Sequence, residues 1–301
     1  MIGRAWLRDA YLRCHALVGA DRAHRAGLEA AMAAGTARYV QVVNLHGTTA
    51  RDAPALRRQL AWLERHFQVL DFAAFQRWWD PAFRPADPRP GVLLTFDDGF
   101  ASNYHVAAPI LEAAGTRGVF FVNPGFCAYD RATAERALRI LARPRGRKVT
   151  DEDWLLMTPE QIADLTRRGH TIGNHTLTHA NLRLTPPAEL DRQIVRSAEL
   201  LAGWCGKPAE AFAWTFTWDA ISRAAWARVL ERHRYCFAAC PGVTDTRVDS
   251  PALIWRTNVE ARFPGYEYRF AYSGLADRRS APLREQLRAM LGPGPGPGRG
   301  R

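Results

Sequence analysis

Short, continuously apolar runs alternate along this chain with longer stretches whose apolar residues recur at helical spacing among charged ones. Such runs are typical of strands buried on both faces, and the amphipathic stretches between them predict helices that cover a sheet. The pattern predicts strands at residues 39–46, 68–72, 92–96, 118–122, 170–174, 212–218, 235–239 and 252–259, and helices at 5–34, 55–67, 72–79, 101–114, 158–169, 185–202, 222–233 and 282–291.

This alternation sets the expected organisation of the chain. About seven β/α alternations in succession indicate a parallel sheet, either closed into a barrel or open and doubly wound. We expect residues 1–38 to form an N-terminal helical extension and residues 39–291 the β/α domain. Residues 292–301 consist of glycine, proline and arginine, a composition that cannot build a core, and a disordered tail is expected there.

Composition and charge narrow the class of protein. The net charge of +11 comes almost entirely from arginine, since Lys148 and Lys207 are the only lysines. No arginine cluster interleaved with aromatic residues marks a nucleic-acid site, so a solvated basic surface is favoured, with peripheral contact with an anionic membrane left open. The five cysteines are scattered and odd in number, which argues against a disulfide framework. Charges interrupt the apolar residues near Met1, and no long apolar window follows, so we expect a cytoplasmic protein without a transmembrane segment.

Two adjacent carboxylates end one of the apolar runs. Asp97 and Asp98 follow the strand predicted at 92–96, and Gly99 allows a sharp turn after them. The carboxyl ends of parallel strands are where α/β folds build active sites. Because neighbouring carboxylates repel unless a cation or a shared proton intervenes, the pair suggests a metal ion.

A pair of histidines offers the remaining ligands for such an ion. His175 and His179 lie in a polar segment that leaves the strand predicted at 170–174. Two imidazoles and one carboxylate leave a coordination position open, which is the composition of catalytic zinc sites. The histidine pair alone is as readily incidental, and it gains weight only in combination with the two aspartates.

The two motifs together resemble a known family. Thr95-Phe-Asp-Asp-Gly99 followed by His175-Thr-Leu-Thr-His179 is similar to the polysaccharide deacetylases, the NodB homology domain of carbohydrate esterase family 4, and the resemblance runs from about residue 39 to 260. It implies an irregular, seven-stranded, TIM-like (β/α) barrel. It also implies that Asp98, His175 and His179 hold a divalent metal, most often zinc, with cobalt or nickel as alternatives, and that Asp97 is the general base.

The general acid departs from the usual family pattern. The family places a histidine in a late motif, whereas no histidine follows His233, which lies in a charged helical run and is interpreted as solvated. Some relatives that deacetylate poly-N-acetylglucosamine carry this motif at the N-terminus. The resemblance therefore implies that His46 is the acid, while an ordinary hydrogen-bonded histidine at a strand end is the alternative.

The segment 212–218 departs further from the family. Thr215 and Thr217 stand where relatives have proline and glycine, and the arginine that orients the base is missing. Arg256 could supply that cation, although a structural arginine is an equal alternative. Aromatic side chains alternate in this segment and are candidates for stacking on a sugar, with core packing as the alternative for each: Trp214, Phe216 and Trp218.

The resemblance implies a hydrolase that removes an N-acetyl or other N-acyl group from an amino sugar. The expected substrate is an N-acetylated oligosaccharide or a lipid- or nucleotide-linked glycan precursor, for which the basic charge is suited. Two alternatives remain, namely hydrolysis of a non-sugar amide or formamide and a sugar-binding protein that has lost catalysis through the changes at Thr215 and Thr217.

Overall fold

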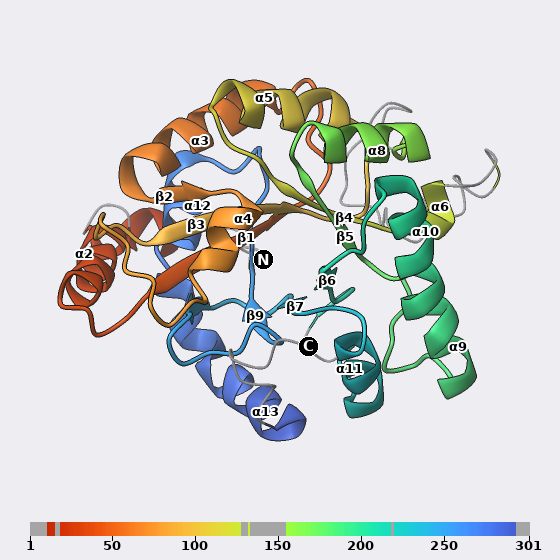
Figure 1. Cartoon of the computed structure of the whole chain (residues 1–301). Helices are drawn as coiled ribbons and strands as arrows, with labels where there is room; N and C mark the ends of the chain where they lie inside the picture. The colour runs from red at the N-terminus through yellow and green to blue at the C-terminus, as the bar shows by residue number, and fades with distance from the viewer. Residues whose placement is uncertain (1–10, 16–18, 128–131, 133–154, 218–219, 293–301) are drawn as a thin grey trace, which may run out of the picture.

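The strands of this computed structural model form one sheet that curls toward a barrel (Figure 1). The structure describes residues 11–15, 19–127, 132, 155–217 and 220–292. Parallel pairing runs in the order β1 (Tyr39–Leu45), β3 (Gly91–Phe96), β4 (Val119–Val122), β5 (Thr171–Asn174), β6 (Ala211–Ala213), β7 (Tyr235–Ala238) and β9 (Ile254–Trp255). The short strand β2 (Gln68–Leu70) pairs with β3, and β8 (Val243–Asp245) runs antiparallel to β1.

One run of chain joins the two ends of this sheet. Strand β9 pairs with β7, and β10 (Thr257–Asn258), which follows after the single residue Arg256, pairs with β1. The sheet is therefore nearly closed, and the β9–β10 run acts as the seventh strand of the barrel beside β1 and β3–β7. The predicted irregular (β/α) barrel is confirmed, and we refer to residues 254–258 as the closing strand.

Helices surround the barrel, as the predicted alternation requires (Figure 1). Two of the predicted helices, at 101–114 and 185–202, begin with or contain a π-helical turn. The helical segments are α2 (Ala20–Ala33), α3 (Ala53–His66), α4 (Phe72–Arg77), η1 (Asn103–Ala107), α5 (Ala108–Ala113), α6 (Pro124–Cys127), α8 (Pro159–Arg167), α9 (Pro187–Asp191), η3 (Arg192–Arg196), α10 (Ser197–Cys205), α11 (Arg223–Leu230), α12 (Gly265–Tyr272), η5 (Leu275–Ser280) and α13 (Ala281–Leu291). No helix in the described ranges is long and apolar enough to cross a membrane.

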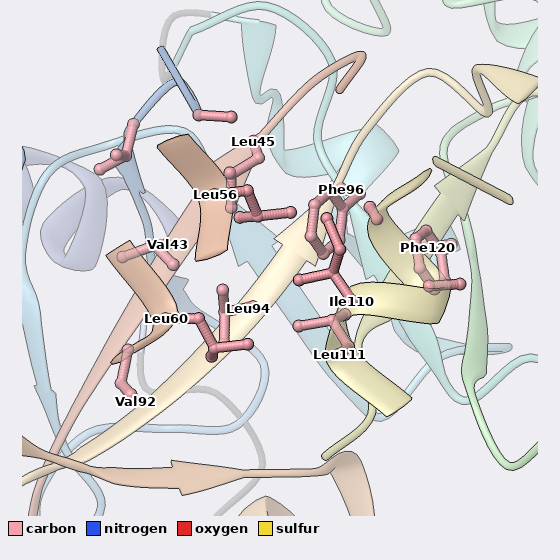
Figure 2. Packing of buried hydrophobic residues seen from close by; sticks show 14 of the residues in the cluster. Val43, Leu45, Leu56, Leu60, Val92, Leu94, Phe96, Ile110, Leu111 and Phe120 are labelled. Atoms are coloured by element: carbon pink, nitrogen blue, oxygen red, sulfur yellow. The ribbon is translucent and has the colours of Figure 1, made fainter. Parts of the chain in front are cut away.

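Each strand of the barrel is buried on both faces, because its side chains alternate between the barrel interior and the surrounding helices. Val92, Leu94 and Phe96 of β3 pack outward against α3 and α5 (Figure 2), whereas Leu93 belongs to the interior cluster. The same alternation turns Asp97, two residues past Thr95, toward the barrel axis. The strand pattern thus decides which polar residue at the strand end enters the site.

Aromatic side chains from α4 close the barrel at the end where the strands begin. Phe72 packs edge-on against Tyr235, the first residue of β7, at 5.3 Å between ring centroids. The Trp78 ring lies so close to Gly91, the first residue of β3, that a Cβ there would approach it to 3.2 Å. The opposite end of the barrel, where the strands finish, is therefore the end that remains open to an active site.

Several sequence predictions differ from the structure. The strand predicted at 212–218 ends at Ala213, because the chain turns away at Phe216, whose φ is 61°. The strand predicted at 252–259 breaks at Arg256, and helix α12 and strand β8 were not predicted. His233 is 2% exposed rather than solvated: its ring bonds to the Ala209 carbonyl and to Asn174.

The N-terminal segment packs on the barrel. Met32 of α2 belongs to the same buried cluster as Val40 and Val42, and the Tyr11 ring lies 6.0 Å from Phe270 of α12. The boundary expected at residue 38 stays a prediction. Residues 293–301 of the expected tail lie outside the described residues, as do the first residues of the helix predicted at 5–34.

Candidate active site

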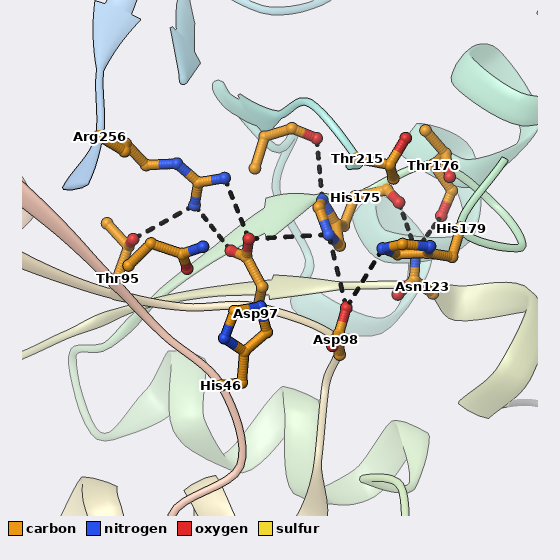
Figure 3. A network of polar contacts seen from close by, with 12 residues as sticks. His46, Thr95, Asp97, Asp98, Asn123, His175, Thr176, His179, Thr215 and Arg256 are labelled. Atoms are coloured by element: carbon orange, nitrogen blue, oxygen red, sulfur yellow. Dashed lines mark hydrogen bonds and ion pairs between the residues drawn. The ribbon is translucent and has the colours of Figure 1, made fainter. Parts of the chain in front are cut away.

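The two carboxylates at the end of β3 are buried and point to different neighbours (Figure 3). Asp98 has a φ of 75° and Gly99 one of 73°, so the chain turns sharply at once after Asp97. Two consecutive strand residues would point to opposite faces of the sheet, whereas this turn lets both carboxylates reach the same site, where His175 Nε2 lies 3.7 Å from Asp97 Oδ2 and 3.5 Å from Asp98 Oδ1. Asp97 faces the closing strand, and Asp98 faces the two histidines.

Arg256 holds Asp97 in a bidentate ion pair. Its Nη1 lies 2.7 Å from Asp97 Oδ1 and its Nη2 lies 3.0 Å from Asp97 Oδ2. Nη1 also donates to Thr95 Oγ1 at 3.3 Å, and the guanidinium stands over the Phe121 ring. The Arg256 side chain is 0% exposed, so the ion pair is shielded from solvent. The structure thus places the cation expected for Asp97 at Arg256 and not in segment 212–218.

This pair decides the charge of Asp97. Burial alone would raise the pKa of the Asp97 carboxyl, but the positive charge of Arg256, with smaller contributions from His175 and His46, outweighs burial and lowers it. Asp97 is therefore ionised at neutral pH and able to accept a proton.

Asp98, His175 and His179 form a compact group of potential metal ligands. One donor atom from each lies within 4.8 Å of the others, and both Nε2 atoms are 3.5 Å from Asp98 Oδ1. The three side chains come from the ends of β3 and β5 and from the loop after β5 (Figure 3).

The loop after β5 is fixed by amide side chains. Asn174 accepts a hydrogen bond from the Thr176 N–H at 3.0 Å, and Asn123 donates to the carbonyls of His175 and Thr176. The Nδ1 atom of His175 lies 2.9 Å from the Ala213 carbonyl, which favours a proton on Nδ1 and leaves Nε2 free as a ligand.

The chemistry of these donors fits a divalent cation. Asp98 Oδ1 is buried and has no hydrogen-bond partner. Burial lowers the pKa of His179 to about 4, so its imidazole is neutral at pH 7, as a metal ligand must be. Two imidazoles and one carboxylate match the ligand set of catalytic zinc sites.

His46 lies beside Asp97 because β1 and β3 are in register. Leu45 pairs with Phe96, and the Asp97 N–H donates to the Leu45 carbonyl at 2.9 Å. The His46 Nδ1 atom is 3.3 Å from Glu260 Oε1. Burial would lower the pKa of His46, but Glu260 together with the nearby aspartates raises it to about 9. His46 is therefore protonated at neutral pH and has a proton to donate.

The aromatic residues of segment 212–218 divide into different environments. Trp214 is 1% exposed and packs edge-on against Phe212 in the core, so the interpretation of Trp214 as a sugar platform is wrong. Phe216 is 42% exposed, and its ring lies 4.7 Å from that of His179 at the site. Trp218 lies outside the described residues.

The backbone around the site is strained. Within the described ranges, the non-glycine residues with positive φ are Asp98, Thr176, His179 and Phe216. Thr217, which stands where relatives have glycine, is not among them, so its β-branched side chain meets no such conflict. Strain of this kind concentrates at functional sites, where surrounding contacts hold the unfavourable conformation.

Glu260 is the site residue that the sequence did not reveal. It follows the closing strand by two positions, and only the pairing of β10 with β1 brings it to His46. Its one sequence signal is a carboxylate near the end of a predicted apolar strand, the same signal that marked Asp97.

Comparisons with known proteins agree with the motifs. Residues 84–229 match the family model described as polysaccharide deacetylase. The putative polysaccharide deacetylase YxkH of Bacillus subtilis (strain 168) is 26% identical over 109 residues, which cover 36% of this chain and 30% of that protein. The match thus spans less than a third of the curated relative.

Solved structures of low identity share the fold. IcaB from Ammonifex degensii superposes with a TM-score of 0.59 at 19% identity, over 78% of this chain and 99% of that chain. The putative polysaccharide deacetylase BA0330 from Bacillus anthracis gives a TM-score of 0.58 at 16% identity, over 78% and 69% of the two chains. The family resemblance inferred from the two motifs is confirmed.

Proposed function

Residues 84–229 match the polysaccharide deacetylase family, and from this premise we propose that the chain is a metal-dependent hydrolase that removes the N-acetyl group of an amino sugar. The observation that carries the proposal is the meeting of three groups at one barrel end. These are an ionised carboxylate, Asp97, a group of three candidate metal ligands and a protonated histidine, His46.

Asp98, His175 and His179 would hold the divalent cation, for which zinc fits the ligands best. A cation in this position supplies Lewis acidity toward the acetyl carbonyl and toward water. Asp97 takes the proton that the attacking water releases, and Arg256 keeps its carboxylate oriented through both oxygens.

His46 completes the reaction by protonating the sugar nitrogen as the C–N bond breaks, so that the products are acetate and the free amine. Glu260 holds the ring through Nδ1, which leaves Nε2 as the donor. The Phe216 ring would stack on the sugar, which its exposure and its position next to His179 support, and its backbone N–H is the proposed donor to the developing oxyanion.

The same proposal includes a cytoplasmic location and a lipid- or nucleotide-linked glycan precursor as the substrate, to which the net charge of +11 is suited.

The test is release of acetate. Purified protein loaded with zinc is incubated with N-acetylglucosamine oligomers and with UDP-N-acetylglucosamine, and acetate and formate are quantified. Asp97→Asn is expected to lose at least about a hundredfold in kcat while it retains the metal. Asp87→Asn, which removes a carboxylate paired with Arg89 at the surface, is the matched control. Full activity of Asp97→Asn would refute the assignment of the base, and formate without acetate would favour a formamide substrate.

A further inference from the structure

A buried polar cluster lies outside the active site, where the closing strand meets β1. It consists of Gln41 of β1, Thr257 of β10 and Asp277 of η5, and none of the three is more than 5% exposed. Since Arg256 points into the barrel, its neighbour Thr257 points outward, toward η5. The cluster therefore lies between the sheet and the helical layer.

Two contacts connect the three side chains. Gln41 Nε2 donates to Thr257 Oγ1 at 2.8 Å, and Thr257 Oγ1 donates to Asp277 Oδ1 at 3.5 Å. The Thr257 hydroxyl has thereby donated its only proton, whereas Gln41 and Asp277 each have one further oxygen atom to satisfy. The carbonyl oxygen of Gln41 and Oδ2 of Asp277 are both buried without a hydrogen-bond partner.

These two oxygens face the same small space above Gly274. A Cβ placed on Gly274 would lie 3.2 Å from Asp277 Oδ2 and 3.7 Å from Gln41 Oε1. It would also lie 2.6 Å from a Val243 methyl group, and the φ of Gly274 is +76°, so only glycine fits there. Two buried acceptors facing one space lack a donor, and a proton on Asp277 would supply it.

Among the described residues, no arginine, lysine or histidine forms an ion pair with the Asp277 carboxyl. Arg284 of α13 uses Nη1 for the main-chain carbonyls of Asp277 and Pro241. Arg278 and Arg279 of the same turn are exposed, and His24 of α2 faces Arg278.

Burial is the largest influence on this carboxyl. It raises the pKa of Asp277 to about 7 against the opposing effects of Arg284, Thr257 and the Val243 backbone. The Cys240 thiol nearby has a pKa raised by burial to about 11 and stays neutral.

We propose that Asp277 is held as a protonated acid whose Oδ2–H donates to Gln41 Oε1, which closes a ring of three hydrogen bonds, and that loss of this proton loosens the closing strand. Thr257 pairs with Val43 and directly follows Arg256, and Glu260 stands three residues further on. Asp277 is thus a positioning residue that acts through the closing strand. This strand carries Arg256, the ion-pair partner of Asp97, and leads to Glu260, the partner of His46. Its effect on turnover rests on the proposed function, whereas its effect on stability does not.

The test compares wild type with Asp277→Asn and Asp277→Leu. Asparagine keeps a donor for Gln41 and an acceptor for Thr257 but cannot titrate, whereas leucine removes the ring. A group whose pKa is raised on folding stabilises most below its unfolded pKa, and this contribution is lost as pH rises toward the folded value. In urea unfolding, the folded-to-unfolded ratio of wild type relative to Asp277→Asn should fall by up to about tenfold per pH unit between about pH 4 and 7, and level off above.

A spectroscopic measurement reports on Asp277 directly. With [γ-¹³C]aspartate labelling, the carboxyl resonance that is absent in Asp277→Asn should titrate with a midpoint near 7. Asp249→Asn, which removes another buried carboxylate, paired with Arg288, is the control and should leave this resonance in place.

Either a midpoint near 4 for this resonance or the same pH profile of stability in wild type and Asp277→Asn would overturn the proposal. If Asp277→Asn does not fold, a wild-type protein without any aspartate resonance titrating between pH 6 and 8 overturns it equally. When the deacetylase activity is present, kcat/KM of wild type relative to Asp277→Asn should decline from pH 6 to 8. When it is absent, unfolding and resonance data still decide whether the ring exists.

Discussion

Replacing Arg256 by methionine tests whether the buried ion pair organises the site. Methionine keeps much of the side-chain volume, including the contact with the Phe121 ring, but leaves the Asp97 carboxylate in a dry site without its cation. Removing one partner of a buried pair costs about 3–5 kcal/mol, because the other charge stays buried and uncompensated. Asp97→Asn alone should lower the free energy of unfolding by a similar amount, since it leaves the buried guanidinium of Arg256 without a counter-charge.

The double variant distinguishes this explanation from ordinary loss of packing. If the cost arises from stranded charge, Arg256→Met combined with Asp97→Asn should cost several kcal/mol less than the sum of the single variants. Urea unfolding at pH 7 in the presence of a chelator measures this without a contribution from metal binding. Arg192→Met is the matched control, because Arg192 pairs with Glu189 at the surface and should cost less than about 1 kcal/mol. Additive costs, or a single-variant cost no larger than that of Arg192→Met, would refute the reasoning.

Three further predictions concern the metal, a buried histidine and a tightly packed glycine. Zinc at a hundredfold excess over its Kd should stabilise the protein by about 2.7 kcal/mol, seen as a rise in Tm that chelator reverses and that His175→Ala lacks. Burial lowers the pKa of His233 to about 4, so its contribution to stability is present above about pH 6.5 and lost as pH falls toward 4; relative to His233→Gln, wild type should lose about 3 kcal/mol over that window in urea unfolding. Gly173→Ala places a Cβ 2.3 Å from the Phe121 ring and should cost at least about 1–3 kcal/mol by thermal unfolding, whereas Gly203→Ala, with nothing within 4 Å, should be neutral or stabilising.

Much of the fold follows from local patterns in the sequence. Continuous apolar runs mark strands that are covered on both faces, and five of the barrel strands, β1, β3, β4, β5 and β7, were found this way close to their observed bounds. The candidate ligand triad was found because its members adjoin strand ends and match a family motif: Asp98, His175 and His179. Each strand and each half of the motif is carried by a short local segment, so pattern and motif suffice for them.

Features that depend on pairing between distant strands could not be obtained in this way. The break of the closing strand at Arg256 and the meeting of Glu260 with His46 follow from the register of β10 on β1, which no local pattern encodes. Trp214 and His233 were misjudged for the same reason. Their burial depends on which neighbours cover them, and tertiary context overrides the tendency of a polar or aromatic residue type.

The candidate site is assembled from three parts of the chain that meet only when the barrel closes. The match to the polysaccharide deacetylase family, residues 84–229, contains the proposed base and all three candidate metal ligands. The proposed acid, His46, precedes that region directly after β1, and Arg256 follows the region within the closing strand; β1 pairs with both β3 and β10. A fragment restricted to 84–229 would therefore keep the candidate ligands but lack Arg256, the ion-pair partner of Asp97, and His46, the proposed proton donor. Closure of the barrel at β1 and β10 is thus the structural condition for the proposed chemistry.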